Sequence, residues 1–421
     1  MSSGVSGRFN MKILFITNSF PFPPNSGGQM RSFNMLKHLA TKGELTLISP
    51  ADHSADDPYI PTLSKYCSQI VLINSKTFGP HSKSGRKVTL KERFEGILKM
   101  VPWSLQDFLS EEFHRKLLTM EPERFDLIFI RYPQLAYYFL TDKKLRKLLR
   151  KIVVDVDDVG VIMQERRTRK LPLGYSKLRN TVDLFFLKNY FRKMRNALAC
   201  LITSAKDRDY LLNKGYAKQV FIVPNTIKIN GYQESNGHDK NSEILFCGML
   251  SYPHNEEAAL FFAERVFPKI KKAFPGVRFT VVGKNPTEKV LKLNSLPGIS
   301  VVGSVPSVKP YYERAAITVV PLLNGAGTRI KILESMSYQK PVVSTSVGAE
   351  GLDVRDGENI CIADDPDSFA KKCVELLMEP KKRNEIARRA YQLVKEKYDH
   401  TVFKRKMNDL LDSLEMSHAK S

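Results

Sequence analysis

The sequence predicts two α/β domains, each built on a parallel sheet with helices on both faces. Three observations indicate this fold class. Strand-like and helix-like hydrophobic periods alternate along the chain, a polar stretch interrupts the alternation once, and the alternation then restarts. The length of 421 residues exceeds what one ordinary hydrophobic core organises, and a 42% hydrophobic content fits a globular enzyme better than a disordered or fibrous chain.

The first domain is expected to begin with a buried strand at Met11–Thr17 (MKILFIT), a short apolar run rich in β-branched and aromatic residues. A loop rich in proline and glycine follows, and then a helix over Arg31–Ala40 with Phe33, Leu36 and Leu39 on one face. Further strands are expected at Leu45–Ser49, Ile70–Ile73, Asp126–Arg131, Ile152–Val156, Leu201–Ser204 and Val220–Val223, with helices between most of them.

The polar stretch Lys228–Ser242 has no apolar period and is interpreted as a linker. Beyond it, strands are expected in EILFCGM, VRFTVVG, ISVVGSV, AITVVPL, PVVSTS and NICIAD, and helices over Glu256–Ala273, Asp367–Met378, Lys381–Lys397 and Val402–Leu414. The predicted organisation is a flexible leader (1–10), a first domain (11–227), the linker (228–242), a second domain (243–397) and a C-terminal helix and tail (398–421).

Composition excludes several classes of protein. The five cysteines are scattered with no close pair, which argues against a disulfide framework or a zinc site and favours a reducing cytosol. No apolar stretch approaches the roughly 18–20 residues that span a bilayer, and the first ten residues do not read as a secretory signal. The net charge of +22 is concentrated between Asp142 and Arg195, where 16 Lys/Arg face 6 Asp/Glu, and it favours an anionic partner or substrate.

The segment Gly325–Val343 (GAGTRIKILESMSYQKPVV) combines flexible backbone, positive charge and one carboxylate at a helix start. It follows an apolar strand, so it is expected at the carboxyl edge of the second sheet, where parallel sheets bind ligands. The N–H groups of the helix start favour an anion, and Thr328, Arg329 and Lys331 add a hydroxyl and two positive charges. The alternative is a glycine turn with a capped helix and a solvated Lys331–Glu334 pair, and the residues alone leave both open.

In its sequence context this segment resembles the nucleotide-sugar-binding part of GT-B glycosyltransferases, particularly the large retaining family four. There a similar Gly-rich turn leads into K-x-x-E-(A/S)-M-(A/S)-x-(G)-x-P-V-(V/I). The resemblance covers nearly the whole chain and includes the start MKILFITNSFPFPPNSGGQMRSFNMLKHLA, VPN at Val223–Asn225 and the late stretch NICIADDPDSFAKKCVELLMEP. It implies GT-B architecture, with two doubly wound Rossmann-like domains facing a cleft and the last helix packing back on the first domain.

The resemblance further implies transfer of a sugar from a nucleotide diphosphate sugar to an acceptor hydroxyl, with retention and without a metal or other cofactor. The implied donor is a UDP- or GDP-sugar, and the implied acceptor is a glycan, a lipid-linked sugar or a polysaccharide precursor. No nucleic-acid partner is expected. Carried over residue by residue, the donor-binding positions are Gly27, Gly28, Gly248, Gly325, Ala326, Gly327, Thr328, Arg329, Lys331 and Glu334.

Within this set the resemblance implies distinct roles. Gly325, Gly327 and Thr328 would donate to the diphosphate with support from Arg329 and Lys331, and Glu334 would contact the ribose hydroxyls. Gly27 and Gly28 would close over the phosphates from the first domain, the alternative being a plain strand-to-helix turn. The sequence departs from the family at Ala326, where relatives often carry a carboxylate, and after the strand EILFC, where FCGMLSYPHNEEA lacks the common Arg and Lys but carries Tyr252 and Asn255.

Two further features leave alternatives open. The stretch VVDVDDVG holds Asp155, Asp157 and Asp158, which suit acceptor binding or catalysis, helix capping, or oxygen ligation of a metal. The basic segments Lys143–Lys151 and Ser176–Arg195 interleave apolar and cationic residues, which suits either a solvated helix face or contact with an anionic membrane. The predicted location is therefore cytoplasmic, with peripheral contact at the inner face of the cytoplasmic membrane. The competing functions are a nicotinamide-dependent Rossmann enzyme, which the missing Gly-x-Gly-x-x-Gly disfavours, and a non-catalytic basic membrane-binding module.

Overall fold

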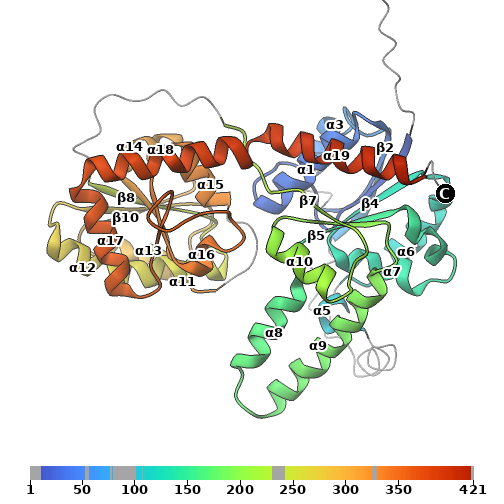
Figure 1. Ribbon diagram of the computed structural model, residues 1–421, viewed down its shortest axis with the longest axis horizontal. Coiled ribbons are helices and arrows are strands. Elements are labelled where there is room, and N and C mark those ends of the chain that lie inside the picture. Colours follow the sequence, from blue (N-terminus) through green and yellow to red (C-terminus); the bar gives the residue numbers. More distant parts are fainter. Residues whose placement is uncertain are drawn as a thin grey trace, which may run out of the picture. The chain divides into compact units, whose positions relative to one another are not determined.

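The computed structural model describes residues 11–52, 56–75, 78, 101–106, 108–229, 242–324 and 330–418 (Figure 1). Its contacts divide the chain into two compact units, Met1–Val223 together with Met407–Ser421 (unit 1) and Pro224–Lys406 (unit 2). The last helix therefore contributes its final residues to the first unit. The leader 1–10 and most of the linker lie outside the described residues, so the domain boundaries expected from the sequence stay a prediction.

Unit 1 is a seven-stranded sheet in the order β3-β2-β1-β4-β5-β6-β7. All neighbouring strands are parallel. The strands are β1 (Met11–Ile16), β2 (Gly43–Ala51), β3 (Gln69–Asn74), β4 (Leu127–Arg131), β5 (Ile152–Asp157), β6 (Ala199–Ile202) and β7 (Val220–Ile222). The helices are α1 (Gly27–Leu39), α3 (Ile60–Leu63), α5 (Trp103–Gln106), α6 (Glu111–Thr119), α7 (Tyr137–Thr141), α8 (Gly160–Lys170), α9 (Tyr175–Met194) and α10 (Ala205–Asn213), with 3-10 turns η1 (Asp57–Tyr59), η3 (Pro122–Arg124), η4 (Pro133–Ala136) and η5 (Leu145–Lys151).

The central strands of unit 1 form where the sequence predicts them because they are buried on both faces. In β1, Ile13 to Ile16 are completely buried, and Ile13 pairs with Leu45 of β2 on one side and Leu127 of β4 on the other. Continuous apolar runs are typical of such parallel strands. The first helix begins earlier than expected, because the Ser26 side chain caps it by accepting from the Gln29 N–H at 3.3 Å.

Helices α8 and α9 form a hairpin that extends away from the sheet of unit 1 (Figure 1). We call residues 160–194 the α8–α9 hairpin. It connects the carboxyl end of β5 to the start of β6, and its two helices pack along each other.

Unit 2 is a six-stranded sheet in the order β10-β9-β8-β11-β12-β13, also with parallel neighbours throughout. The strands are β8 (Glu243–Cys247), β9 (Arg278–Val282), β10 (Ile299–Gly303), β11 (Ile317–Val320), β12 (Val342–Ser344) and β13 (Cys361–Ile362). The helices are α11 (Pro253–Phe261), α12 (Phe267–Ala273), α13 (Glu288–Leu291), α14 (Lys309–Arg314), α15 (Ile330–Ser337), α16 (Ser346–Ala349), α17 (Pro366–Met378) and α18 (Pro380–Lys397), with a 3-10 turn η7 (Lys292–Ser295). Helix α19 (His400–His418) begins in unit 2 and belongs to unit 1 from Met407 onward. A π-helical turn, η6 (Phe262–Val266), joins α11 to α12, so the helix expected over Glu256–Ala273 is continuous in the chain but not regular.

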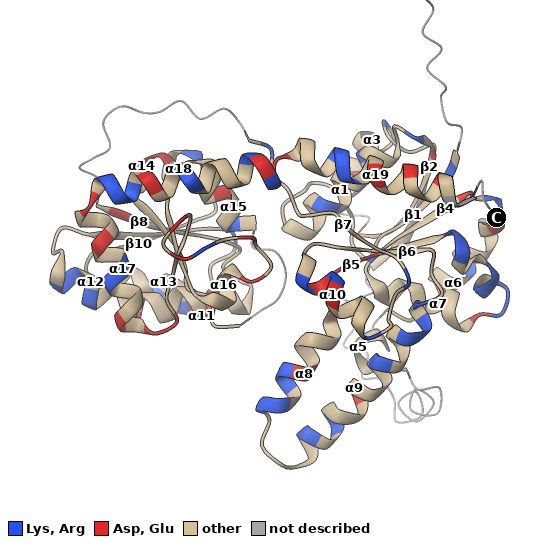
Figure 2. Ribbon diagram, in the orientation of Figure 1, with Lys and Arg blue, Asp and Glu red and all other residues tan. Residues whose placement is uncertain are grey.

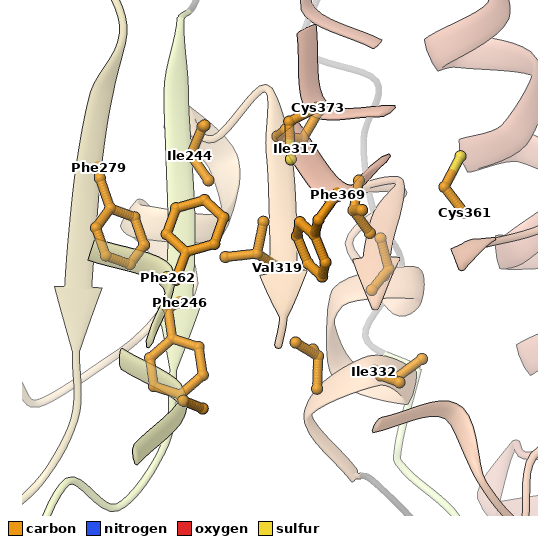
Figure 3. Packing of buried hydrophobic residues seen from close by; sticks show 14 of the residues in the cluster. Ile244, Phe246, Phe262, Phe279, Ile317, Val319, Ile332, Cys361, Phe369 and Cys373 are labelled. Carbon is orange, nitrogen blue, oxygen red and sulfur yellow. The ribbon is translucent and has the colours of Figure 1, made fainter. Parts of the chain in front are cut away.

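Aromatic rings fill the core of unit 2 (Figure 3). Phe262 lies 4.5 Å from Phe279 and 5.8 Å from Phe369, measured between ring centroids, and all three side chains are completely buried. Ile332 of α15 joins the same core and is also completely buried. This packing anchors α15 to the sheet, so the polar residues next to Ile332 on that helix have a defined position.

The structure bears on two predictions from composition, the state of the cysteines and the presence of membrane-spanning helices. All five cysteines are buried free thiols, as expected for small core residues. Among the helices of the described part of the chain, none combines the length and the apolar character needed to cross a bilayer.

Candidate functional site

The strand order of each unit determines where polar side chains gather. In both sheets the order reverses between two central strands, β1 and β4 in unit 1 and β8 and β11 in unit 2. The loops after those strands diverge at the carboxyl edge, which is where open parallel sheets bind ligands. Most of the candidate residues follow β1, β5, β8 or β11, so they belong to these two edges.

At the carboxyl edge of unit 2, Lys331 is held by Asn255. The Lys331 ammonium donates to Asn255 Oδ1 at 2.6 Å, and Asn255 Nδ2 donates to the Met249 carbonyl at 2.9 Å. The ammonium also lies 4.8 Å from the centre of the Phe246 ring, within the range of a cation–π contact. One side chain from α11 thus orients a cation from α15, although the two residues are 76 positions apart.

Gly248, another of the predicted donor-binding residues, lies against this pair. A Cβ atom at Gly248 would come within 3.0 Å of Asn255 Nδ2 and 3.1 Å of Lys331 Nζ. The absence of a side chain therefore leaves the space that the Asn255–Lys331 hydrogen bond occupies. The structure brings Gly248 and Lys331 together, whereas Gly325, Ala326, Gly327, Thr328 and Arg329 lie outside the described residues.

Glu334, one turn after Lys331, lies in a partly buried polar cluster. Its Oε2 accepts from the Tyr312 hydroxyl at 3.2 Å, and the Tyr312 ring stacks on Tyr338 with centroids 4.8 Å apart and planes at 11°. Burial raises the pKa of the Glu334 carboxyl, while Tyr312 and Lys331 oppose the rise. The pKa of the neighbouring Cys247 thiol is raised to about 12, chiefly by burial, so it is not a nucleophile at neutral pH.

At the carboxyl edge of unit 1, Gly27 and Gly28 form the first turn of α1 and not the preceding loop. A Cβ atom at Gly28 would lie 2.5 Å from the Tyr132 hydroxyl oxygen, so the glycine permits this close approach. Tyr132 directly follows β4 with a positive φ of 77°. Its hydroxyl accepts from Arg131 Nη2 at 3.1 Å, and its ring lies 3.8 Å from the Arg131 guanidinium carbon.

Two arginines neutralise the aspartates that end β5. Arg31 of α1 binds both oxygens of Asp155, at 2.9 and 2.7 Å, and donates to the Val223 carbonyl at 2.7 Å. Arg131 of β4 reaches Asp155 at 2.8 Å and Asp157 at 2.7 Å. Burial by itself lowers the pKa of the Arg131 guanidinium, but the charges of Asp157 and Asp155 outweigh it and leave the pKa raised.

The burial of this network defines what its members can do. Arg31 is 3% exposed, Arg131 0%, Asp155 1% and Asp157 8%. A carboxylate that is enclosed and paired with two guanidinium groups orients its neighbours more readily than it reacts, so Asp155 is suited to positioning. Asp157 is 8% exposed against 1% for Asp155, and Asp158 is only partly buried, so these two are the more accessible members of the predicted trio.

The sequence left open that these aspartates bind a metal ion, but in the structure arginines already supply positive charge to Asp155 and Asp157. No group of three or more His, Cys, Asp or Glu side chains within the described ranges is arranged to hold a metal ion. The carboxylates of Asp155 and Asp157 have arginine partners where a metal ligand would need open oxygen atoms.

Arg31 was not among the residues singled out in the sequence. Helical spacing contains a signal for it, because Arg31, Met35 and His38 recur at intervals of four and three and are all buried. Phe33, which was expected on the core face of this helix, is instead partly exposed and makes edge contacts with Phe22 and Tyr66. An arginine in register with core residues therefore marks a buried ion pair, with its carboxylate partner elsewhere in the chain.

The structure has two doubly wound parallel sheets, and its matches to solved structures cover nearly the whole chain. This architecture is the GT-B class of glycosyltransferase folds. Residues 241–379, about a third of the chain, match the family described as "Glycosyl transferases group 1". The matched residues contain Gly248, Asn255, Lys331 and Glu334. The fold class and the enzyme class expected from the sequence are thereby confirmed.

Individual relatives are distant in sequence. The chain is 23% identical over 408 residues to an uncharacterized 44.6 kDa protein in the cps region of Klebsiella pneumoniae, a match that spans 92% of this chain and 96% of the relative. Sucrose-phosphate synthase from Thermosynechococcus elongatus has a similar structure, with a TM-score of 0.68 at 16% identity over 97% of this chain and all of the other. Anabaena HepE, solved in complex with UDP-glucose, superposes with a TM-score of 0.64 at 14% identity over 96% of this chain and all of HepE.

Proposed function

We propose that this glycosyltransferase takes a UDP- or GDP-sugar as donor and holds its diphosphate at the carboxyl edge of the unit 2 sheet. The observation that carries the proposal is the Lys331 ammonium, fixed by Asn255 at 2.6 Å at the point where the strand order reverses. A positioned cation at that edge matches the charge of a nucleoside diphosphate. HepE, a structural neighbour, was solved with UDP-glucose, which supports a donor of this kind.

In this proposal Lys331 and Glu334 of α15 bind different parts of the donor. Lys331 stabilises the charge that develops on the leaving diphosphate, together with the residues that precede α15 in the sequence, Gly325, Ala326, Gly327, Thr328 and Arg329. The positive charge comes from the protein, so the reaction proceeds without a metal ion. Glu334 accepts hydrogen bonds from the ribose hydroxyls, and Gly248 leaves room beside the diphosphate.

The unit 1 edge is proposed to bind the acceptor, a glycan or a lipid-linked or polysaccharide precursor. Asp157 and Asp158 contact the acceptor hydroxyls, while Arg31 and Arg131 position Asp155 and the end of β5. Gly27 and Gly28, in the first turn of α1, are proposed to take part in binding the donor phosphates. Transfer retains the anomeric configuration, as in the family that the sequence resembles. The presence of a relative in a cps region supports a polysaccharide product.

A binding experiment separates the two donor roles. Titration calorimetry of the full chain with UDP, GDP, inorganic pyrophosphate and NAD compares wild type with Lys331→Met, Asn255→Ala and Glu334→Gln. Lys331→Met should weaken both nucleotide and pyrophosphate binding about tenfold or more, because a hydrogen bond to a charged group contributes roughly 1.5–3 kcal/mol. Asn255→Ala should have a smaller effect in the same direction, and Glu334→Gln should weaken UDP or GDP binding while leaving pyrophosphate unchanged.

Matched controls are Lys272→Met on α12 and Glu264→Gln on η6, which alter exposed residues of the same unit. The proposal is wrong if the chain binds NAD alone or none of these ligands. It is equally wrong if Lys331→Met and Glu334→Gln bind UDP and GDP as tightly as the two controls. Retention is tested separately, from the anomeric configuration of the product by NMR.

A further inference from the structure

Most of the buried residues of the α8–α9 hairpin lie toward its base. The buried residues of α9 all lie in its second half, namely Asp183, Phe186, Leu187, Tyr190, Phe191 and Met194. In α8 only Val161 and Thr168 are buried, and no residue from 171 to 182 is. The turn between the helices and the first two turns of α9 therefore stand clear of the unit 1 core (Figure 1).

Polar contacts brace this hairpin, so its exposed end has a defined shape. Lys188 pairs with Glu165 across the two helices at 2.7 Å. Gln164 donates to Asn180 at 3.0 Å, also across the helices. At the base, the Trp103 backbone N–H donates to Asp183 Oδ1 at 2.6 Å.

The exposed end carries large apolar side chains that the described residues of unit 1 leave exposed. Leu173 is 91% exposed, Tyr175 81%, Leu178 65% and Phe185 57%. The hairpin contributes five of the fifteen exposed large hydrophobic residues among those described, including the two most exposed. Tyr175, Leu178, Val182 and Phe185 follow one another at intervals of three, four and three, so they form one stripe along α9. A contiguous exposed stripe of this kind marks an interaction surface.

The same hairpin is strongly basic. Residues 160–194 contain nine Lys/Arg and two Asp/Glu. The two acids are Glu165, which pairs with Lys188, and Asp183, which is buried at the base. Exposed cations on α8 include Arg167, Arg169 and Lys170, and Figure 2 shows basic residues along both helices of the hairpin.

We propose that the tip of the α8–α9 hairpin docks on the surface of an anionic phospholipid bilayer. Leu173, Tyr175 and Leu178 enter the boundary between headgroups and acyl chains, and the lysines and arginines around them meet the lipid phosphates. A bilayer offers both kinds of contact, an anionic layer directly above an apolar one. This partner goes beyond the proposed transfer reaction and does not depend on it.

Two other partners fit less well. A second copy of the chain, meeting the first through the same surface, would bring nine cations against nine and only two acids against two. A nucleic acid would match the charge but would leave the aliphatic side chains of Leu173 and Leu178 without an apolar layer.

Docking would also have a consequence for the unit 1 edge. Helix α8 begins at Gly160, three residues after Asp157 at the end of β5. Eleven helical residues rise about 16 Å. When the tip is docked, the carboxyl edge of this sheet therefore lies about the length of α8 from the bilayer surface.

Vesicle sedimentation tests the proposal with the full chain. Wild type should bind vesicles of 70% phosphatidylcholine and 30% phosphatidylglycerol and should bind pure phosphatidylcholine weakly. The triple change Leu173→Ser, Tyr175→Ser, Leu178→Ser should lower the partition coefficient more than tenfold. The pair Arg169→Glu, Lys170→Glu should lower it more than tenfold as well, since removing each charge counts about fivefold near an anionic surface.

Matched controls are Met378→Ser with Met416→Ser, two residues each 64% exposed, and Lys381→Glu with Arg388→Glu on α18. Both control pairs should sediment like wild type. Insertion is measured with a single reporter: in a Trp103→Phe background, Leu173→Trp should shift its emission to shorter wavelength on anionic vesicles, whereas Met378→Trp should not. The chain contains one tryptophan, so each reporter is unambiguous.

Three results would overturn the proposal. Anionic vesicles that bind the hairpin variants and wild type alike would show that the charge of the whole chain is responsible. Binding to duplex DNA with no vesicle binding and no emission shift would assign the surface to nucleic acid. A dimer in sedimentation velocity that the triple serine variant converts to monomer would assign it to a second copy of the chain.

Discussion

The close approach of Gly28 to Tyr132 predicts a large difference between two otherwise similar glycine-to-alanine substitutions. Gly28 lies in the first turn of α1 and Gly160 begins α8. A Cβ atom at Gly28 would lie 2.5 Å from the Tyr132 hydroxyl oxygen, whereas nothing lies within 4 Å of one at Gly160. Ordinary contact begins at 3.4 Å, so Gly28→Ala requires the Tyr132 ring to retreat by about 0.9 Å.

The ring has little freedom to retreat. The Tyr132 hydroxyl accepts from Arg131 Nη2 at 3.1 Å, the ring lies 3.8 Å from the same guanidinium, and the backbone has a φ of 77°. Overpacking of this kind costs about 1–3 kcal/mol, while alanine at a helix position gains up to about 1 kcal/mol over glycine. Gly28→Ala should therefore lower the free energy of unfolding by about 1–3 kcal/mol relative to Gly160→Ala.

A double-mutant cycle identifies the cause. With Tyr132→Phe the hydroxyl oxygen is gone, and the nearest remaining ring atom, Cζ, lies 3.8 Å from the added methyl carbon, an ordinary contact. Gly28→Ala should then cost nothing more than Gly160→Ala, which gives a coupling of about 1–3 kcal/mol. Urea unfolding followed by circular dichroism measures all of the variants. The reasoning fails if Gly28→Ala and Gly160→Ala unfold at the same urea concentration, or if Gly28→Ala costs the same with phenylalanine at position 132.

Two further predictions concern buried charges. Arg31→Met should lower the free energy of unfolding by about 3–5 kcal/mol, because it leaves the enclosed Asp155 with half of its compensation; urea unfolding against the exposed control Arg115→Met measures this, and equal midpoints would contradict it. In unit 2, burial and the nearby Arg383 lower the pKa of Lys340 from 10.5 to about 8. The folded chain therefore binds this proton less tightly than the unfolded chain, so the contribution of Lys340 to stability is unfavourable below about pH 8 and becomes more favourable as pH rises from about 8 to 10.5. At pH 7, Lys340→Met should increase the free energy of unfolding by up to about 3 kcal/mol and should therefore raise the melting temperature. This gain over wild type should disappear by about pH 10.5. A gain in melting temperature that is the same at pH 7 and pH 10.5 would refute the linkage.

Much of unit 2 could be predicted from the sequence alone. The buried strands are continuous apolar runs, and Lys331 and Glu334 stand next to Ile332 and Leu333, whose burial orients the helix. Spacing along one helix therefore placed both polar residues on its outer side. The Asn255–Lys331 hydrogen bond could not be predicted in the same way, since no local pattern connects residues 76 positions apart.

The sequence by itself determined the alternation of strands and helices, the fold class and the two candidate edges, because hydrophobic periodicity and the residues at strand ends are local properties. Only the tertiary structure decided the role of Asp155. The stretch VVDVDDVG reads as three available carboxylates, yet Arg31 and Arg131 come from two other elements and enclose Asp155 completely. The sequence shows which residues carry a charge. Whether that charge meets solvent, a substrate or an opposite charge depends on which strands the sheet places side by side.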